Sequence, residues 1–225
     1  MAESLAAILP IAVGIILSPL PVVAVILMLF SSRARANGLA FLAGWAAGLA
    51  AVGALTLLLA STQDVEQGGA PARWTLALKL LLGAGLLFLA YRSFEKRPRE
   101  GEEPSLPGWM RAVDAFTAPR ALGLAALLSG VNPKNLLLTV SAMTGVALAG
   151  LPAGQSIVLL VVFVLASSLG VAVPVAYALL GGESARATLD GWKTWLAAHN
   201  SVVMAVVLLV LGVKIFFEAL AGLVG

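Results

Sequence analysis

The chain has 225 residues, of which 60% are hydrophobic and only 11% are charged, and its mean hydropathy is +1.01. Soluble domains carry about 25% charged residues, so this composition excludes a soluble globular protein and indicates one that crosses a membrane several times. The formal net charge is only +3, and the basic residues lie between apolar segments, which favours membrane orientation over nucleic-acid binding. The chain has no cysteine, which excludes disulfides, thiolate metal ligands and a thiol mechanism.

Six apolar stretches are long enough to cross a bilayer, which requires about 20 residues each. They lie at about residues 5–30, 39–61, 75–94, 120–148, 154–181 and 200–221. No basic residue precedes the first stretch, only Glu3, so we interpret it as a retained span rather than a removed signal peptide. The sequence predicts an all-α polytopic membrane protein with six transmembrane helices.

The first span is interrupted near its middle by Leu17-Ser18-Pro19-Leu20-Pro21-Val22. A proline inside a helix removes one backbone hydrogen bond and clashes with the carbonyl four residues back, at a cost of about 3 kcal/mol. The freed carbonyls are expected to be those of Ile15 and Leu17. In a bilayer such groups are tolerated only when they are buried in protein or line a wet cavity.

The fourth span has a matching interruption, Val131-Asn132-Pro133-Lys134-Asn135-Leu136, which is expected to free the carbonyl of Ser129. Ser18-Pro19 and Asn132-Pro133 both have the form of an N-cap followed by proline at the first helical position. Each break can therefore start a new half-helix, whose N-terminus offers free N–H groups and about half a positive charge. The sequence predicts broken first and fourth helices and favours an anionic ligand there.

A polar stretch rich in Glu, Arg and Pro separates two halves that repeat weakly. We predict a first three-helix repeat at residues 1–94, a cytoplasmic linker at 95–119 and a second three-helix repeat at 120–225. Three pairs of segments match: Ser18 to Pro21 with Asn132 to Asn135, Phe41 to Gly48 with Phe163 to Gly170, and Gly83 with Gly212. Three spans is an odd number, so the second copy must enter the membrane from the opposite side. This is the inverted repeat of many secondary transporters, which bind substrate at the midplane; chance similarity of apolar segments is the alternative.

The distribution of Lys and Arg predicts the orientation. Loops one, three and five hold ten of these residues: Arg33, Arg35, Arg92, Lys96, Arg97, Arg99, Arg111, Arg120, Arg186 and Lys193. Loops two and four hold only Arg73. By the positive-inside rule both termini lie outside and the linker is cytoplasmic. Loop five, with Trp192 and Trp195 around Lys193, is expected to be an amphipathic segment on the inner surface.

Three lysines fall within spans, and Lys134 lies at the centre of the fourth. A lysine at that depth costs about 2.5–3.5 kcal/mol, and no acidic residue lies near it in sequence. Either carbonyls freed by Pro133 or Glu218 of the sixth span compensate it structurally, or an anionic group of the substrate does so. Lys79 can reach the outer surface, and Lys214 is expected to form an ion pair with Glu218 one turn away.

The predicted substrate-binding residues are those at the two breaks: Ser18, Pro19, Pro21, Asn132, Pro133, Lys134 and Asn135. No catalytic residue, metal ligand or cofactor is predicted, because no span contains Asp and the single histidine, His199, lies at the inner end of span six. An enzyme is therefore not expected. Gly44, Gly48 and Gly170 are expected to allow close approach of helices.

The Ser-Pro-Leu-Pro motif at Ser18, the Asn-Pro-Lys-Asn motif at Asn132, the basic turn from Ser31 to Gly38 and the six-span length resemble the lysine-exporter (LysE) superfamily. Within it the chain is most similar to the sulfolipid- and peptidoglycolipid-addressing proteins, called the GAP family. The resemblance implies a multi-pass inner-membrane protein with inverted repeats that moves a lipid or glycolipid outward. Amino-acid exporters of the superfamily carry a Gly-Pro-Gln motif in the first span, and its absence here argues against free lysine or arginine as substrate.

The sequence thus predicts a transporter that exports or flips a lipid or glycolipid, with an anionic one favoured, at the broken helices. The alternatives are an exporter of a small solute such as an amino acid or cation, and an accessory subunit of a lipid export complex that does not itself transport. Expected partners are the membrane lipid or glycolipid, a second copy of the chain in a homodimer and the machinery of envelope-lipid biosynthesis. No nucleic-acid partner is expected.

Overall fold

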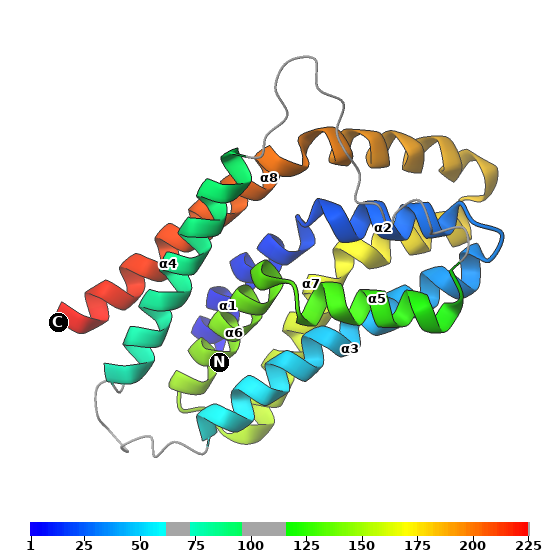
Figure 1. Cartoon of the computed structure of the whole chain (residues 1–225). Coiled ribbons are helices and arrows are strands. Elements are labelled where there is room, and N and C mark those ends of the chain that lie inside the picture. The colour runs from blue at the N-terminus through cyan, green and yellow to red at the C-terminus, as the bar shows by residue number, and fades with distance from the viewer. Residues whose placement is uncertain (62–72, 96–115, 225) are drawn as a thin grey trace.

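The computed structural model describes residues 1–61, 73–95 and 116–224, and in these ranges the secondary structure is helical, without strands (Figure 1). The helices are α1 Ala2–Ile16, α2 Pro19–Leu29, α3 Ala34–Ser61, α4 Arg73–Glu95, α5 Ala118–Gly130, α6 Pro133–Leu148, α7 Ala153–Leu180 and α8 Gly182–Val224. Most of the predicted linker, residues 95–119, falls outside the described residues, so the division into two repeats and a linker stays a prediction.

Four described helices, α3, α4, α7 and α8, are long and apolar enough to cross a membrane. Two further pairs meet the same criterion together but are bent at a short break, α1 with α2 by 54° and α5 with α6 by 62°. Up to six spans result if each bent pair is one span. The all-α polytopic class and the broken first and fourth helices are therefore confirmed.

The end of the chain differs from the prediction of a surface segment followed by a separate span. Both belong to α8, a single helix of 43 residues, because no proline lies between Gly182 and Val224 to interrupt it. In Figure 1, α8 first runs beside α2 and then turns along α4. Its first part buries Ala185 and Leu189 against α2, so the expected amphipathic segment packs one face on the protein.

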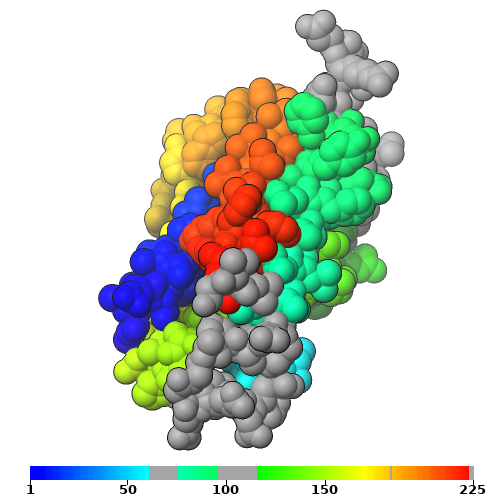
Figure 2. Space-filling model, turned by 90° about the vertical axis from the view of Figure 1, so that its left-hand side faces the viewer, coloured from blue at the N-terminus to red at the C-terminus, as the bar shows by residue number. Residues whose placement is uncertain are grey.

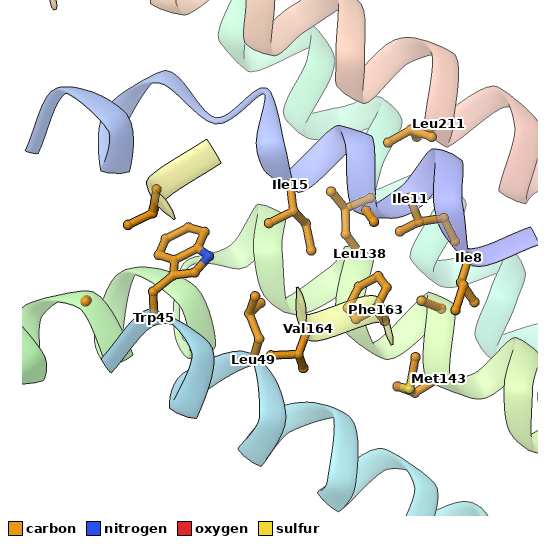
Figure 3. Packing of buried hydrophobic residues seen from close by; sticks show 14 of the residues in the cluster. Ile8, Ile11, Ile15, Trp45, Leu49, Leu138, Met143, Phe163, Val164 and Leu211 are labelled. Atoms are coloured by element: carbon orange, nitrogen blue, oxygen red, sulfur yellow. The ribbon is translucent and has the colours of Figure 1, made fainter. Parts of the chain in front are cut away.

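Buried apolar side chains from all eight described helices form the core, and Figure 3 shows the part contributed by α1, α3, α6, α7 and α8. The side chains that meet there are Ile8, Ile11, Ile15, Trp45, Leu49, Leu138, Met143, Phe163, Val164 and Leu211. Large apolar side chains such as Leu81 and Leu165 are exposed on the outside of the helices, as a lipid-facing surface requires. Because lipid is itself apolar, close packing rather than burial from water holds such helices together.

Glycines allow the closest approaches between helices, as predicted. A Cβ on Gly48 of α3 would lie 2.7 Å from the carbonyl oxygen of Ala126 in α5, and a Cβ on Gly170 of α7 would lie 2.6 Å from that of Ile16 in α1. Real Cβ atoms do not approach backbone atoms this closely, so these positions require glycine. The expected small-residue contacts are therefore confirmed.

Helices α4 and α8 pack antiparallel through a reciprocal pair of glycine contacts. A Cβ on Gly83 would lie 2.8 Å from the backbone of Phe216, and a Cβ on Gly212 would lie 3.1 Å from the backbone nitrogen of Leu87. Figure 2 shows the face of the molecule on which the second part of α8 lies between α1 and α4. This packing brings α8 beside both helix breaks.

Candidate functional site

The first break lies between α1 and α2, where Ser18 is the N-cap with extended backbone angles and Pro19 is the first helical residue. The N–H of Ser18 donates to the carbonyl oxygen of Ile15 at 3.1 Å, one residue later than the α-helical acceptor, Gly14. The expectation that Ile15 carries a free carbonyl is therefore wrong. The tightened last turn of α1 instead frees the carbonyl of Gly14.

The second break repeats this pattern between α5 and α6. The N–H groups of Val131 and Asn132 both donate to the carbonyl oxygen of Leu127, at 2.9 and 3.2 Å, so Leu128 loses its α-helical donor. The side-chain nitrogen of Asn135 replaces it, 2.9 Å from the Leu128 oxygen. Asn132 is the N-cap of α6, and its side-chain oxygen accepts from the backbone N–H of Lys134 at 3.0 Å.

Lys134 connects the two breaks. Its ammonium donates to the Gly14 carbonyl oxygen at 2.8 Å and to the hydroxyl oxygen of Ser18. The Ser18 hydroxyl in turn donates to the side-chain oxygen of Asn135 at 3.4 Å. Lys134 and Ser18 are each only 3% exposed, and Asn135 is 1% exposed. Side chains from the start of α6 thus satisfy a freed carbonyl at each break and hold the breaks together.

The charge of Lys134 is not neutralised by this arrangement. Its two protein acceptors are neutral oxygens, and no carboxylate among the described residues forms an ion pair with it. Glu218 instead pairs with Lys214 at 3.6 Å, which confirms that predicted pair and makes a Lys134–Glu218 pair wrong. A carbonyl does compensate Lys134 in part, but it is one freed at the first break, not by Pro133.

A cavity of about 190 Å³ lies at the breaks, and we call it the Lys134 cavity. Its lining residues are Ser18, Leu20, Pro21, Ser93, Asn132, Lys134, Asn135, Asn200, Ser201 and Met204. Five of the seven predicted site residues line it. The other two, Pro19 and Pro133, hold the first helical positions of α2 and α6 and act by breaking the helices.

The sequence interpretation missed the contribution of α4 and α8 to this cavity. Ser93 is a polar residue near the end of the third span, and Asn200 and Ser201 are polar residues at the start of the sixth. Their position at the cytoplasmic ends predicted for these two spans was the signal that could have identified them. A cavity of this volume has room for several water molecules, at about 30 Å³ each, and so for a small polar group.

One comparison with known proteins gives a match. A family model described as Sap, sulfolipid-1-addressing protein, matches residues 8–221, a range that includes both helix breaks and every residue lining the Lys134 cavity. Comparison with curated proteins and with solved structures gives no match. Because the family model covers nearly all of the chain, this protein belongs to the family of sulfolipid-1-addressing proteins.

Proposed function

We propose that the protein exports or flips an anionic lipid or glycolipid, and that the acidic headgroup binds to Lys134 in the Lys134 cavity. The observation that carries the proposal is a buried ammonium on a cavity wall with neutral acceptors only. A charge buried in this way is costly unless a counter-charge accompanies it. An ammonium has three N–H donors, so a donor is left for an anion in the cavity.

The family description supports a lipid as the source of that anion. The family is named for a sulfolipid, a class of lipid whose headgroup carries an acidic sulfur-containing group. The cavity volume of about 190 Å³ is smaller than the 300–1,000 Å³ typical of pockets for whole drug-sized ligands. We therefore assign only the headgroup to the cavity and leave the acyl chains in the bilayer.

The N-terminus of α2 offers fewer free N–H donors to this site than an ordinary helix N-terminus would. Pro19 and Pro21 have no N–H, so two of the four donors normally free at a helix N-terminus are missing. Leu20, which lines the cavity, keeps its N–H. Lys134 is therefore the principal anion-binding group in the proposal.

The inverted repeat is part of the proposal, and the helix contacts support it. Gly83 meets Phe216 while its sequence counterpart Gly212 meets Leu87, so exchanging the two halves exchanges these contacts. Likewise α3 packs on α5 while α7 packs on α1. Opposite insertion of two such halves brings the two breaks together near the midplane, where transporters of this architecture bind substrate.

We further propose that the protein lies in the inner membrane with both termini outside and the linker cytoplasmic, as the positive-inside rule predicts. In this orientation the Lys134 cavity, near the end of α4 that precedes the linker, opens first to the cytoplasmic half. A homodimer, a biosynthetic partner and membership of the LysE superfamily remain predictions. The proposed mechanism includes no chemical step and no cofactor.

Reconstituted vesicles test the proposal with two fluorescently labelled glycolipids that differ only in a sulfate, sulfogalactosylceramide and galactosylceramide. Dithionite quenches the label in the outer leaflet, so the remaining signal reports transfer from the inner leaflet. We expect the protein to accelerate transfer of the sulfated lipid selectively and Lys134→Met to abolish this. The control Lys193→Met, which removes a cation paired with Asp190 outside the cavity, should retain transfer.

Equal transfer of both lipids, or undiminished transfer by Lys134→Met, would contradict the proposal. Absence of transfer together with co-purification of a second protein would favour the accessory subunit. Export of a small solute is the remaining candidate, since the cavity volume also suits a small anion. Transport of such an anion without any transfer of the sulfated lipid would support that alternative.

A further inference from the structure

A second cavity of about 50 Å³ lies elsewhere along the same helices, and we call it the Lys79 cavity. Its polar lining residues are Ser4 of α1, Lys79 of α4, Ser141 of α6, and Lys214 and Glu218 of α8. Four helices therefore bring two ammonium groups, two hydroxyls and one carboxylate to one small space. The proposed function does not use any of these side chains.

The two cavities are arranged in series. Going from the Lys134 cavity to the Lys79 cavity, the lining advances from Lys134 to Ser141 along α6 and from Met204 to Lys214 along α8. At 1.5 Å per helical residue these steps are about 10 and 15 Å. The second cavity lies toward the chain ends that the predicted topology places outside.

An apolar layer separates the cavities. Leu138 of α6 and Leu211 of α8 are both buried and converge on Gly14 of α1, where an added Cβ would overlap Leu211 and lie 3.4 Å from Leu138. Figure 3 shows these two leucines beside Ile11 and Ile15 of α1. This layer closes the path between the cavities in the present state.

The charges of the Lys79 cavity leave an excess of positive charge. Lys214 and Glu218 form an ion pair at 3.6 Å, whereas Lys79 has no ion-pair partner among the described residues. The cavity volume matches one or two water molecules at about 30 Å³ each, which suits a sulfate or phosphate group but not a sugar. The hydroxyls of Ser4 and Ser141 supply further donors at the same place.

We infer that the Lys79 cavity is a second anion-binding site, which receives the acidic headgroup of the lipid after it leaves Lys134. The inference rests on the proposed function and adds a second binding site to the same transport pathway. Passage of the headgroup between the two cavities requires Leu138 and Leu211 to move apart. Release at the second site is favoured because Lys214 and Glu218 are partly exposed there whereas Lys134 is buried, and solvent weakens the attraction between exposed charges.

Single cysteines test this inference directly, because the natural chain has none. Ser141→Cys and Ser4→Cys place a thiol in the Lys79 cavity, and Ser93→Cys places one in the Lys134 cavity. Ser156→Cys, in α7 near the same end of the molecule but in neither cavity, is the control. Reaction with an anionic and a cationic methanethiosulfonate reagent gives a rate ratio that reports the local charge preference.

We expect the ratio of anionic to cationic reagent to be several-fold higher for Ser141→Cys and Ser4→Cys than for Ser156→Cys. Lys79→Gln should lower it to the control value, and Lys79→Arg should preserve it. Vesicles containing sulfogalactosylceramide should slow modification of the Ser141→Cys thiol, while galactosylceramide, or inorganic sulfate at the same concentration, should not.

Equal ratios at Ser141→Cys and Ser156→Cys would overturn the second site. Protection by inorganic sulfate without protection by the sulfated lipid would overturn its role in receiving the lipid headgroup. Protection of Ser93→Cys by the sulfated lipid without protection of Ser141→Cys would overturn the second site while leaving the proposed function intact. If lipid transfer in vesicles fails, the proposed function falls, whereas the charge ratio at Ser141→Cys still decides whether the cavity prefers anions.

Discussion

The ammonium of Lys134 lies 2.8 Å from the main-chain carbonyl oxygen of Gly14, 120 residues earlier in the chain. A side chain from the second half therefore supplies the hydrogen bond that the first half loses at its own break. The same ammonium lines the cavity at the breaks, so the anion binding that we propose and the contact between the two breaks depend on one group. A ligand that draws Lys134 away from Gly14 would loosen the contact between the breaks.

Lys134→Met should abolish lipid transfer with only a small change in thermal stability. The substitution leaves the Gly14 carbonyl without its donor, which costs about 1–3 kcal/mol, but it also removes a buried charge that lacks a counter-charge. These effects oppose each other. Melting in detergent, measured beside transfer in vesicles, checks the result. Because Glu218 pairs with Lys214, Glu218→Gln should not alter the stability of the Met variant; early melting that Glu218→Gln rescues would refute this account.

Replacing Pro19 and Pro21 with alanine should preserve membrane insertion but reduce transfer. A continuous helix would let the Ser18 N–H return to the Gly14 carbonyl and so displace Lys134 from its acceptor. The variant is compared with wild type for yield in the membrane fraction and for transfer of the sulfated lipid. Undiminished transfer would show that these prolines only bend the helix.

Gly44→Ala should destabilise the protein, whereas Gly123→Ala should not. A Cβ on Gly44 would overlap the carbonyl oxygen of Leu122 and lie 2.8 Å from its Cα, while a Cβ on Gly123 meets nothing within 4 Å. Overpacking of this kind costs about 1–3 kcal/mol, and alanine is favoured over glycine by about 0.5–1 kcal/mol in an unconstrained helix position. Thermal melting of the matched pair in one detergent decides the point, and equal melting temperatures would contradict the close packing of α3 on α5.

Topology reporters fused at about residues 36, 105 and 188 should indicate the cytoplasm, and those at about 67 and 151 the outside. The expectation follows from the concentration of Lys and Arg in the odd-numbered loops. Fusions that insert without loss of lipid transfer provide the control for correct folding. A linker reporter on the outside would refute both the orientation and the inverted repeat derived from it.

The positions of the breaks could be predicted from the sequence because their cause is local. Pro19 and Pro133 lack an N–H wherever they stand, and Ser18 and Asn132 favour the N-cap, so α2 and α6 begin where expected. The carbonyl that becomes free was not predictable in this way. It depends on whether the last turn of α1 tightens, and the structure shows that it does, which moves the free carbonyl from Ile15 to Gly14.

The partners of Lys134 could not be predicted because they depend on long-range packing. The sequence shows that the charge of a lysine within a span needs a compensating partner, and Glu218 is the one carboxylate within the six predicted spans. The packing of α8 on α4 instead places Glu218 in the Lys79 cavity with Lys214. Ser93 and Asn200 reach the Lys134 cavity for the same reason, since no local pattern indicates which helices will be neighbours.

The contact between α4 and α8 has the same form from either helix. Gly83 of α4 contacts Phe216 of α8, and Gly212 of α8 contacts Leu87 of α4. This is the form of an isologous interface between two copies of one subunit. The helices run antiparallel, so separate copies of one half could pair through this surface only if they entered the bilayer in both directions. In the inverted repeat that we propose, joining the halves in one chain assigns a direction to each and ensures that every molecule contains one of each kind.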